Sequence, residues 1–100
     1  MAQLEFETVN INFSNVRGTQ RETRTVSFGN TVERAEVAVQ GFLFDFVSAD
    51  NNLDRIQVRG RRVDTAGNDV EVEATVIVAD RTRDDDYNAT VNLVIIAVVA

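Results

Sequence analysis

AEVAVQGFLFDFVSADNNLDRIQVRGRRV, residues 35–63, is the stretch that decides the fold. It holds two long runs in which apolar and polar residues alternate, the pattern of strands whose successive side chains point to opposite faces. A polar segment at residues 48–52 separates the runs, and turn residues between two alternating runs are typical of a β-hairpin. The sequence therefore predicts a central hairpin, with the other runs as its partners.

The first of these runs changes phase near its middle. Its apolar residues occupy odd positions from 35 to 39 and even positions from 42 to 46. A flat strand cannot keep both sets on one face, so we expect a bulge or sharp bend at Gln40 and Gly41. At about 3.3 Å per residue, about thirteen extended residues would reach about 43 Å, well beyond the usual strand. We therefore expect a bent strand that is shared by two sheets or passes from one core to another.

Four further runs favour strands. Residues 4–13 alternate twice with opposite phase, which predicts a bulge near Thr8. Residues 21–28 are rich in β-branched side chains, residues 70–79 alternate cleanly, and residues 89–100 are mostly apolar. With no helical periodicity and no long linker, the sequence predicts one all-β domain over residues 1–100, a six-stranded antiparallel β-sandwich.

The turn at residues 64–69 is expected to close a second hairpin, with Gly67 at a positive φ angle. Keeping both apolar sets on one face places Arg61 opposite Glu71 and Arg59 opposite Glu73. Cross-strand ion pairs then account for the RGRR segment at residues 59–62 better than a surface for polyanions does.

The last strand is apolar on both faces from residue 93 to residue 99. A strand that is apolar on both faces is covered on both faces. In so small a domain we expect the second cover to be another copy of the chain, with Leu93, Ile95 and Ala97 at the oligomer interface.

Composition excludes several classes of function. The chain has no His, Cys or Lys, so the Ser-His, Cys-His and Ser-Lys nucleophile arrangements cannot be built. Carboxylate pairs remain, as in glycoside hydrolysis, but sixteen acidic residues single out no pair. A net charge of -6 argues against nucleic acid and anionic membranes as partners. We expect no enzyme activity, no cofactor and no metal.

The ends of the chain carry no targeting signal in this interpretation. The first ten residues lack the positive segment and apolar core of a signal peptide, and residues 91–100 are too few to span a bilayer. We expect a cytoplasmic protein, or one exported without a cleaved signal.

Candidate ligand groups gather near two predicted loops. Arg55 begins the second central strand beside Asp50, Asn51 and Asn52, and Tyr87 lies in the charged loop at residues 80–88, before the last strand. A guanidinium can hold sugar hydroxyls or a carboxylate, and a Tyr ring can lie against a sugar face. For each residue alone, a structural role is the competing interpretation.

The charged loop itself allows another reading. Asp80, Asp84, Asp85 and Asp86 offer oxygen ligands for calcium but lack the spacing of an EF-hand loop, so a solvated loop is the competing interpretation.

Several of these features together resemble the H-type lectin domain, the snail agglutinin and discoidin family. They are VSF at residues 26–28, the run at 35–46, the turn into the strand at 53–63, Gly67, and Tyr87 followed by apolar residues 91, 93 and 95. The resemblance spans about residues 21–99. It implies a six-stranded antiparallel sandwich, assembly as trimers or pairs of trimers, and binding of galactose or N-acetylgalactosamine near subunit boundaries. Arg55 and Tyr87 lie where the family has a sugar-binding Arg and Tyr, whereas the family's Trp and adjacent His have no counterpart here.

Two hypotheses follow from the sequence. The first is an oligomeric carbohydrate-binding module without catalysis, which binds through Arg55, Asp50, Asn51, Asn52 and Tyr87. The alternative is a structural or assembly protein that oligomerises through its apolar last strand.

Overall fold

The computed structural model of the protein describes residues 2–46, 53–80 and 86–100, and these contain six strands and no helix. The strands are β1 (Gln3–Val16), β2 (Thr19–Ser27), β3 (Val32–Phe46), β4 (Leu53–Ala66), β5 (Asp69–Asp80) and β6 (Tyr87–Val99). The predicted all-β class and the six strands are confirmed.

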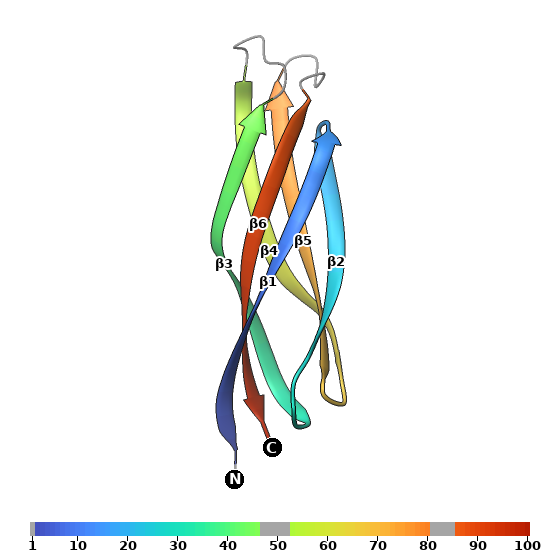
Figure 1. Cartoon of the computed structure of the whole chain (residues 1–100), viewed down its shortest axis with the longest axis vertical. Helices are drawn as coiled ribbons and strands as arrows, with labels where there is room; N and C mark the ends of the chain where they lie inside the picture. The colour runs from blue at the N-terminus through green and yellow to red at the C-terminus, as the bar shows by residue number, and fades with distance from the viewer. Residues whose placement is uncertain (1, 47–52, 81–85) are drawn as a thin grey trace.

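The strands form two antiparallel sheets that pack as a β-sandwich (Figure 1). Sheet A has the order β1-β6-β3 and sheet B the order β2-β5-β4. Each sheet has a central strand from the carboxyl-terminal third of the chain and two edge strands from earlier in it. The predicted antiparallel sandwich is confirmed.

The predicted central hairpin is wrong. β3 pairs with β6 in sheet A, and β4 pairs with β5 in sheet B. The two strands of the predicted hairpin, β3 and β4, therefore lie in different layers. β3 also pairs with β6 along its whole length, so it is not shared by two sheets. Alternation says which side chains of a strand share a face, but it does not say which strand lies beside it.

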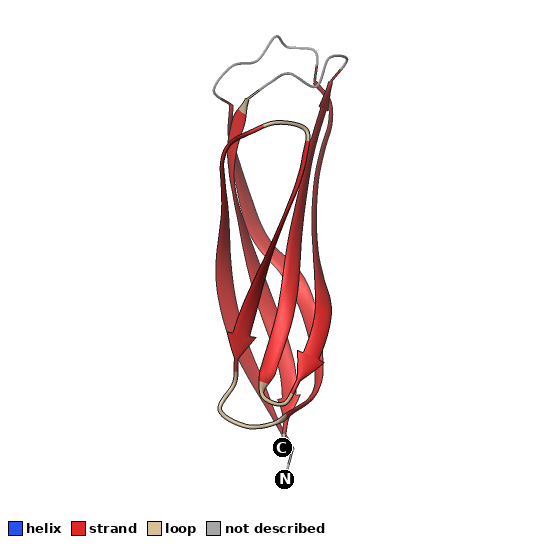
Figure 2. Cartoon of the chain, turned by 90° about the vertical axis from the view of Figure 1, so that its right-hand side faces the viewer, coloured by secondary structure: helices blue, strands red, loops and turns tan. Residues whose placement is uncertain are grey.

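The sandwich is a narrow rod, with extents of 55 × 18 × 18 Å. Its long axis follows the strands, and both termini lie at one end of it (Figure 2). At the terminal end, Gly67 has a φ of 61° and its carbonyl accepts the Val32 N–H at 2.9 Å. This bond ties the β4–β5 turn to the segment that crosses from sheet B to sheet A. We refer to this end as the terminal end and to the other as the loop end.

The two predicted bulges have different outcomes. The register of β3 against β6 shifts between Val39 and Gly41, which confirms the bulge at Gln40 and keeps the apolar residues on both sides of it facing inward. β1 pairs with β6 without interruption from Gln3 to Phe13, so the bulge near Thr8 is wrong. The phase change in β1 therefore means that Leu4 and Phe6 face outward.

The register of the β4–β5 hairpin also differs from the prediction. A bulge between Arg62 and Asp64 places Arg61 opposite Glu73 and Arg59 opposite Thr75. Arg61 Nε donates to Glu73 Oε1 at 2.9 Å, so one ion pair forms, with a different acid from the one predicted.

The core lies between the sheets and is built mainly from the two central strands. Alternate residues of β5 and β6 point into it, and the edge strands add fewer large side chains. Its fully buried members include Ile11, Val70, Val72, Val76, Tyr87, Val91, Leu93, Ile95 and Val99.

Candidate functional site

The predicted ligand residues are not brought together by the described part of the chain. Arg55 is exposed at the start of β4, at the loop end, as expected. Asp50, Asn51 and Asn52 lie outside the described residues. Of the predicted set, Arg55 alone is described and accessible to a ligand.

Tyr87 has a structural role instead of the predicted ligand contact. Its side chain has no exposed surface, and its hydroxyl donates to the Gly18 carbonyl at 2.7 Å. Its ring packs against Phe44 and Phe46, with centroid distances of 5.7 and 6.3 Å. Burial raises the pKa of the Tyr87 phenol above its usual range. A buried ring whose hydroxyl already donates to a backbone carbonyl has no free surface for a sugar, so Tyr87 is not accessible to a ligand.

The calcium alternative gains no support from the described residues. Asp86 accepts a hydrogen bond from Arg17, which lowers the pKa of its carboxyl. Asp84 and Asp85 lie outside the described residues. Within residues 2–46, 53–80 and 86–100 there is no group of acidic side chains arranged to hold a metal ion.

The predicted oligomer interface is on the wrong face of β6. Leu93, Ile95 and Ala97 are fully buried within a single chain and belong to its core. The strand is apolar on both faces, and the sequence alone does not say which face the chain itself covers. The residues of opposite parity, Val94, Ile96 and Val98, face away from sheet B and are half-buried.

An apolar surface covers the terminal end of sheet A. It consists of Leu4 and Phe6 on β1 together with Val94, Ile96 and Val98 on β6. Cross-strand partners share a face, and the register pairs Leu4 with Val98 and Phe6 with Ile96. Leu4 and Phe6 are each 61% exposed. Because neither side chain belongs to the core, polar residues at these two positions would not weaken it.

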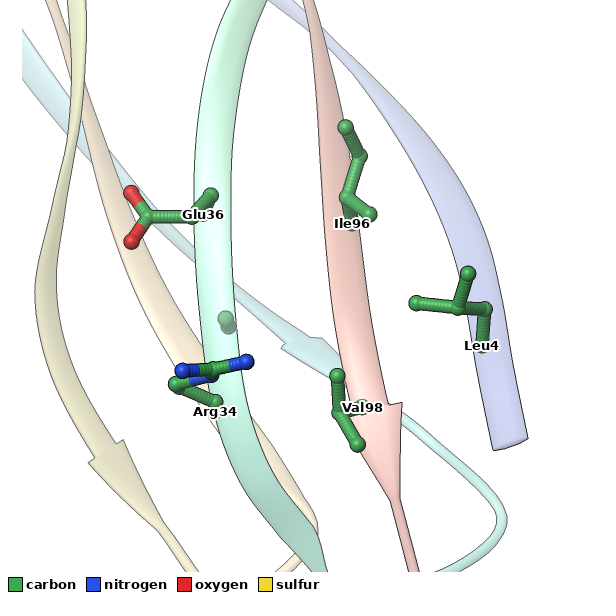
Figure 3. A pocket seen from close by; sticks show the side chains of 6 residues that line it. Leu4, Arg34, Glu36, Ile96 and Val98 are labelled. Atoms are coloured by element: carbon green, nitrogen blue, oxygen red, sulfur yellow. The ribbon is translucent and has the colours of Figure 1, made fainter. Parts of the chain in front are cut away.

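Opposite charges flank the apolar surface on its β3 side. Arg34 lies beside Val98, and Glu36 lies beside Ile96. Leu4, Ile96, Val98, Arg34 and Glu36 line a hollow of about 250 Å³ together with Ala35. Figure 3 shows Leu4 pointing towards β6 while the Glu36 carboxylate points away from it, so the floor is apolar and the charges lie on the rim.

The comparisons with known proteins supply no relative. No protein-family model, no curated protein and no solved structure matches the chain. The resemblance to H-type lectins therefore stays a prediction, and function has to be argued from the surfaces of this chain. The described residues also contain no helix long and apolar enough to cross a membrane.

Sequence reasoning missed Leu4 and Phe6, although a signal for them was present. The phase change at Thr8 was interpreted as a bulge that would turn both residues inward. An uninterrupted strand explains the same pattern by moving its apolar residues from the outer face to the inner face. Phase change in an edge strand is thus a sign of a second apolar surface as well as of a bulge.

Proposed function

We propose that the protein is a non-catalytic β-sandwich that self-associates, with two copies stacking the apolar surfaces of sheet A. The observation that carries this proposal is the exposure of Leu4 and Phe6, each 61%, beside the outward side chains of β6. Contiguous exposed apolar side chains with a charged rim are typical of protein interaction surfaces.

A second copy is the occupant that the charges favour. The outward side chains form two neighbouring rows across the three strands. One row is Arg34, Val98 and Leu4, and the next is Glu36, Ile96 and Phe6. A two-fold axis that crosses the strands between these rows brings Arg34 of one copy to Glu36 of the other, and the reverse. It also stacks apolar residues on apolar residues, so the surface is self-complementary, as a two-fold interface requires.

The size of the surface sets the strength of the association. Three strands about 4.8 Å apart and five residues of about 3.3 Å give a footprint of about 250 Å² per copy. Permanent interfaces cover about 800 Å² or more per partner. We therefore expect a reversible dimer whose population rises with concentration. The trimers or hexamers that the lectin resemblance implies stay a prediction, and a two-fold contact would also join two trimers.

Sedimentation velocity over a concentration series tests the proposal. We expect the wild type to shift from monomer to dimer and Ile96→Asp to stay monomeric, because a charge in the middle of the stacked surfaces would be buried without a partner. Leu43→Asp is the matched control, since Leu43 is an outward apolar residue of sheet A, 65% exposed, at the other end of β3. A wild type that is monomeric at every concentration contradicts the proposal.

A charge exchange tests the orientation. Arg34→Glu should weaken the dimer by placing like charges together, and the double variant Arg34→Glu with Glu36→Arg should restore it. If the double variant is as weak as the single one, Arg34 and Glu36 do not meet across a two-fold axis.

Carbohydrate binding is the second candidate function, and the exposure of Arg55 at the loop end favours it. A glycan array that includes galactose and N-acetylgalactosamine tests it, with Arg55→Ala as the comparison. Wild-type binding that Arg55→Ala removes supports a lectin-like role, and no wild-type binding rejects it.

A further inference from the structure

We propose that the outer face of sheet B binds a short sulfated oligosaccharide through an arginine surface made of Arg21, Arg55, Arg59 and Arg61. This function goes beyond self-association and is independent of it, since the arginine surface and the apolar surface lie on opposite layers of the sandwich. It shares Arg55 with the carbohydrate-binding candidate but does not rest on it, because it requires a sulfate group and the arginines of the central part of the face.

The strand register brings these four side chains to one face. Arg21 on β2 and Arg59 on β4 are both partners of Thr75 on the central strand β5. Arg61 pairs with Glu73, two residues before Thr75 along β5, and Arg55 pairs with Ala79, four residues after it, in the same outward parity. Because cross-strand partners project to the same side, all four guanidinium groups lie outside the sandwich.

The bulge between Arg62 and Asp64 creates this arrangement. On the carboxyl-terminal side of the bulge, Asp64 and Ala66 face outward. If the strand continued in that parity, Arg62, Gly60 and Val58 would follow on the outer face, and the arginines at 59 and 61 would point into the core. The extra residue exchanges the faces, so the arginines go to the surface and Val58 goes towards the core.

Three of the four arginines on this surface form no ion pair with the acidic side chains that the structure describes. Arg61 is paired with Glu73, whose side chain is 13% exposed. Arg21, Arg55 and Arg59 are exposed and have no acidic partner among the described residues. With its amide oxygen turned towards Arg59, Gln57 accepts from Nε and Nη2, both at 2.7 Å, which holds that guanidinium without neutralising it. The three unopposed charges are available to an anion.

Thr75 marks the centre of the site. It lies between Arg21 and Arg59 on the outer face and is only 9% exposed, because its neighbours cover it. The outer strands are about 10 Å apart, a distance that two arginine side chains can span to meet above the central strand. A sulfate ester has three free oxygens, so it can accept from both guanidiniums and from the Thr75 hydroxyl, whereas a carboxylate has two oxygens.

The rest of the face favours a short sulfated saccharide over nucleic acid. Thr19 and Thr23 present hydroxyls beside the arginines, and the described outer face of sheet B has no aromatic side chain on which a base could stack. Towards the terminal end the outward residues include three acids, Asp64, Glu71 and Asp69, which repel a long polyanion such as nucleic acid. From Arg55 to Arg61 the surface spans about 20 Å at about 3.3 Å per residue, so the ligand is short.

Calorimetric titration with a sulfated tetrasaccharide tests the proposal, with the desulfated tetrasaccharide, a uronate tetrasaccharide and inorganic sulfate as comparisons at equal ionic strength. We expect the sulfated sugar to bind most tightly, the uronate more weakly, and the desulfated sugar not at all. Arg59→Gln and Arg21→Gln should each reduce the affinity about ten-fold.

Matched controls lie on the same strands. Arg24 on β2, which pairs with Glu22, and Arg62 on β4 have the opposite parity, so Arg24→Gln and Arg62→Gln should keep the wild-type affinity. Equal loss in all four variants, equal affinity for the desulfated sugar, or binding of inorganic sulfate alone would overturn the proposal. So would an Arg59→Gln variant that changes the sedimentation coefficient while no sugar binds, because sheet B would then contact a second copy.

Discussion

Gly60 on β4 lies directly against the side chain of Leu93 on β6. A Cβ added to Gly60 would lie 2.6 Å from Leu93 Cδ2 and 3.5 Å from Val37 Cγ1 and Val39 Cγ2. Leu93 is fully buried, so its side chain has little room to move away. The glycine is thus required by the approach of the two sheets, since its φ is not positive.

Gly60→Ala should lower the free energy of unfolding by about 1–3 kcal/mol, the usual cost of overpacking a core. Urea denaturation measures it. Gly29→Ala is the control, because a Cβ there meets nothing within 4 Å and the residue has no positive φ. That change should be neutral or slightly stabilising. Equal effects of the two variants would mean that the contact with Leu93 relaxes freely.

The neighbouring residues Ile95 and Ile96 provide a direct test of the two faces of β6. Ile95 is fully buried in the core, whereas Ile96 faces outward and is half-buried. We expect Ile95→Ala to cost about 2–5 kcal/mol of monomer stability through the cavity it leaves, and Ile96→Ala to cost clearly less. Urea unfolding at a concentration too low for association separates this effect from dimerisation. The opposite order would mean that the faces of β6 are assigned wrongly.

The sequence predicted the strands better than their partners. Alternation in β5 and the bulge at Gln40 depend on side chains within one strand, and both are confirmed. The pairing of β3 with β6 instead of β4 depends on which layer the chain enters after β3, and the sequence of residues 47–52 has no pattern that distinguishes a hairpin from a crossing between layers.

The candidate sites were harder to predict for the same reason. Arg59 and Glu73 both face outward as expected, but one bulge at Val63 decides that they do not meet. The position of Tyr87 in a predicted charged loop favours an exposed ring, whereas its burial depends on Phe44 and Phe46, which are distant in the sequence. Surface chemistry follows from register, and a single inserted residue changes register without changing the apolar pattern on either side of it.

The Arg17–Asp86 pair should be visible in the titration of one carboxyl group. The hydrogen bond from Arg17 lowers the pKa of Asp86 below its ordinary value of 3.8. This contribution to stability is therefore present above pH 3.8 and is lost as the pH falls through the lower, folded-state pKa. Because the Arg17 side chain is 60% exposed and the Asp86 side chain 26% exposed, solvent screens the pair and its effect on stability is small. Carboxyl NMR should show Asp86 titrating at lower pH in the wild type than in Arg17→Gln, and identical midpoints would contradict the pairing.

Tyr87 should make the protein less stable in alkaline solution. Its pKa in the folded state is raised above 10.0 by burial, so below pH 10 both the folded and the unfolded chain hold the phenol proton and stability is unaffected. Above pH 10 the unfolded chain releases the proton first, and the free energy of unfolding falls until the pH passes the folded-state pKa. Tyr87 is the only Tyr and the chain has no Trp, so tyrosinate absorbance reports on this residue alone. We expect the folded protein to ionise at higher pH than the protein in urea, and coincident curves would show that the phenol is open to solvent.

Tyr87→Phe should abolish this pH dependence and cost about 0.5–1.5 kcal/mol at neutral pH, because the hydrogen bond to the Gly18 carbonyl is lost.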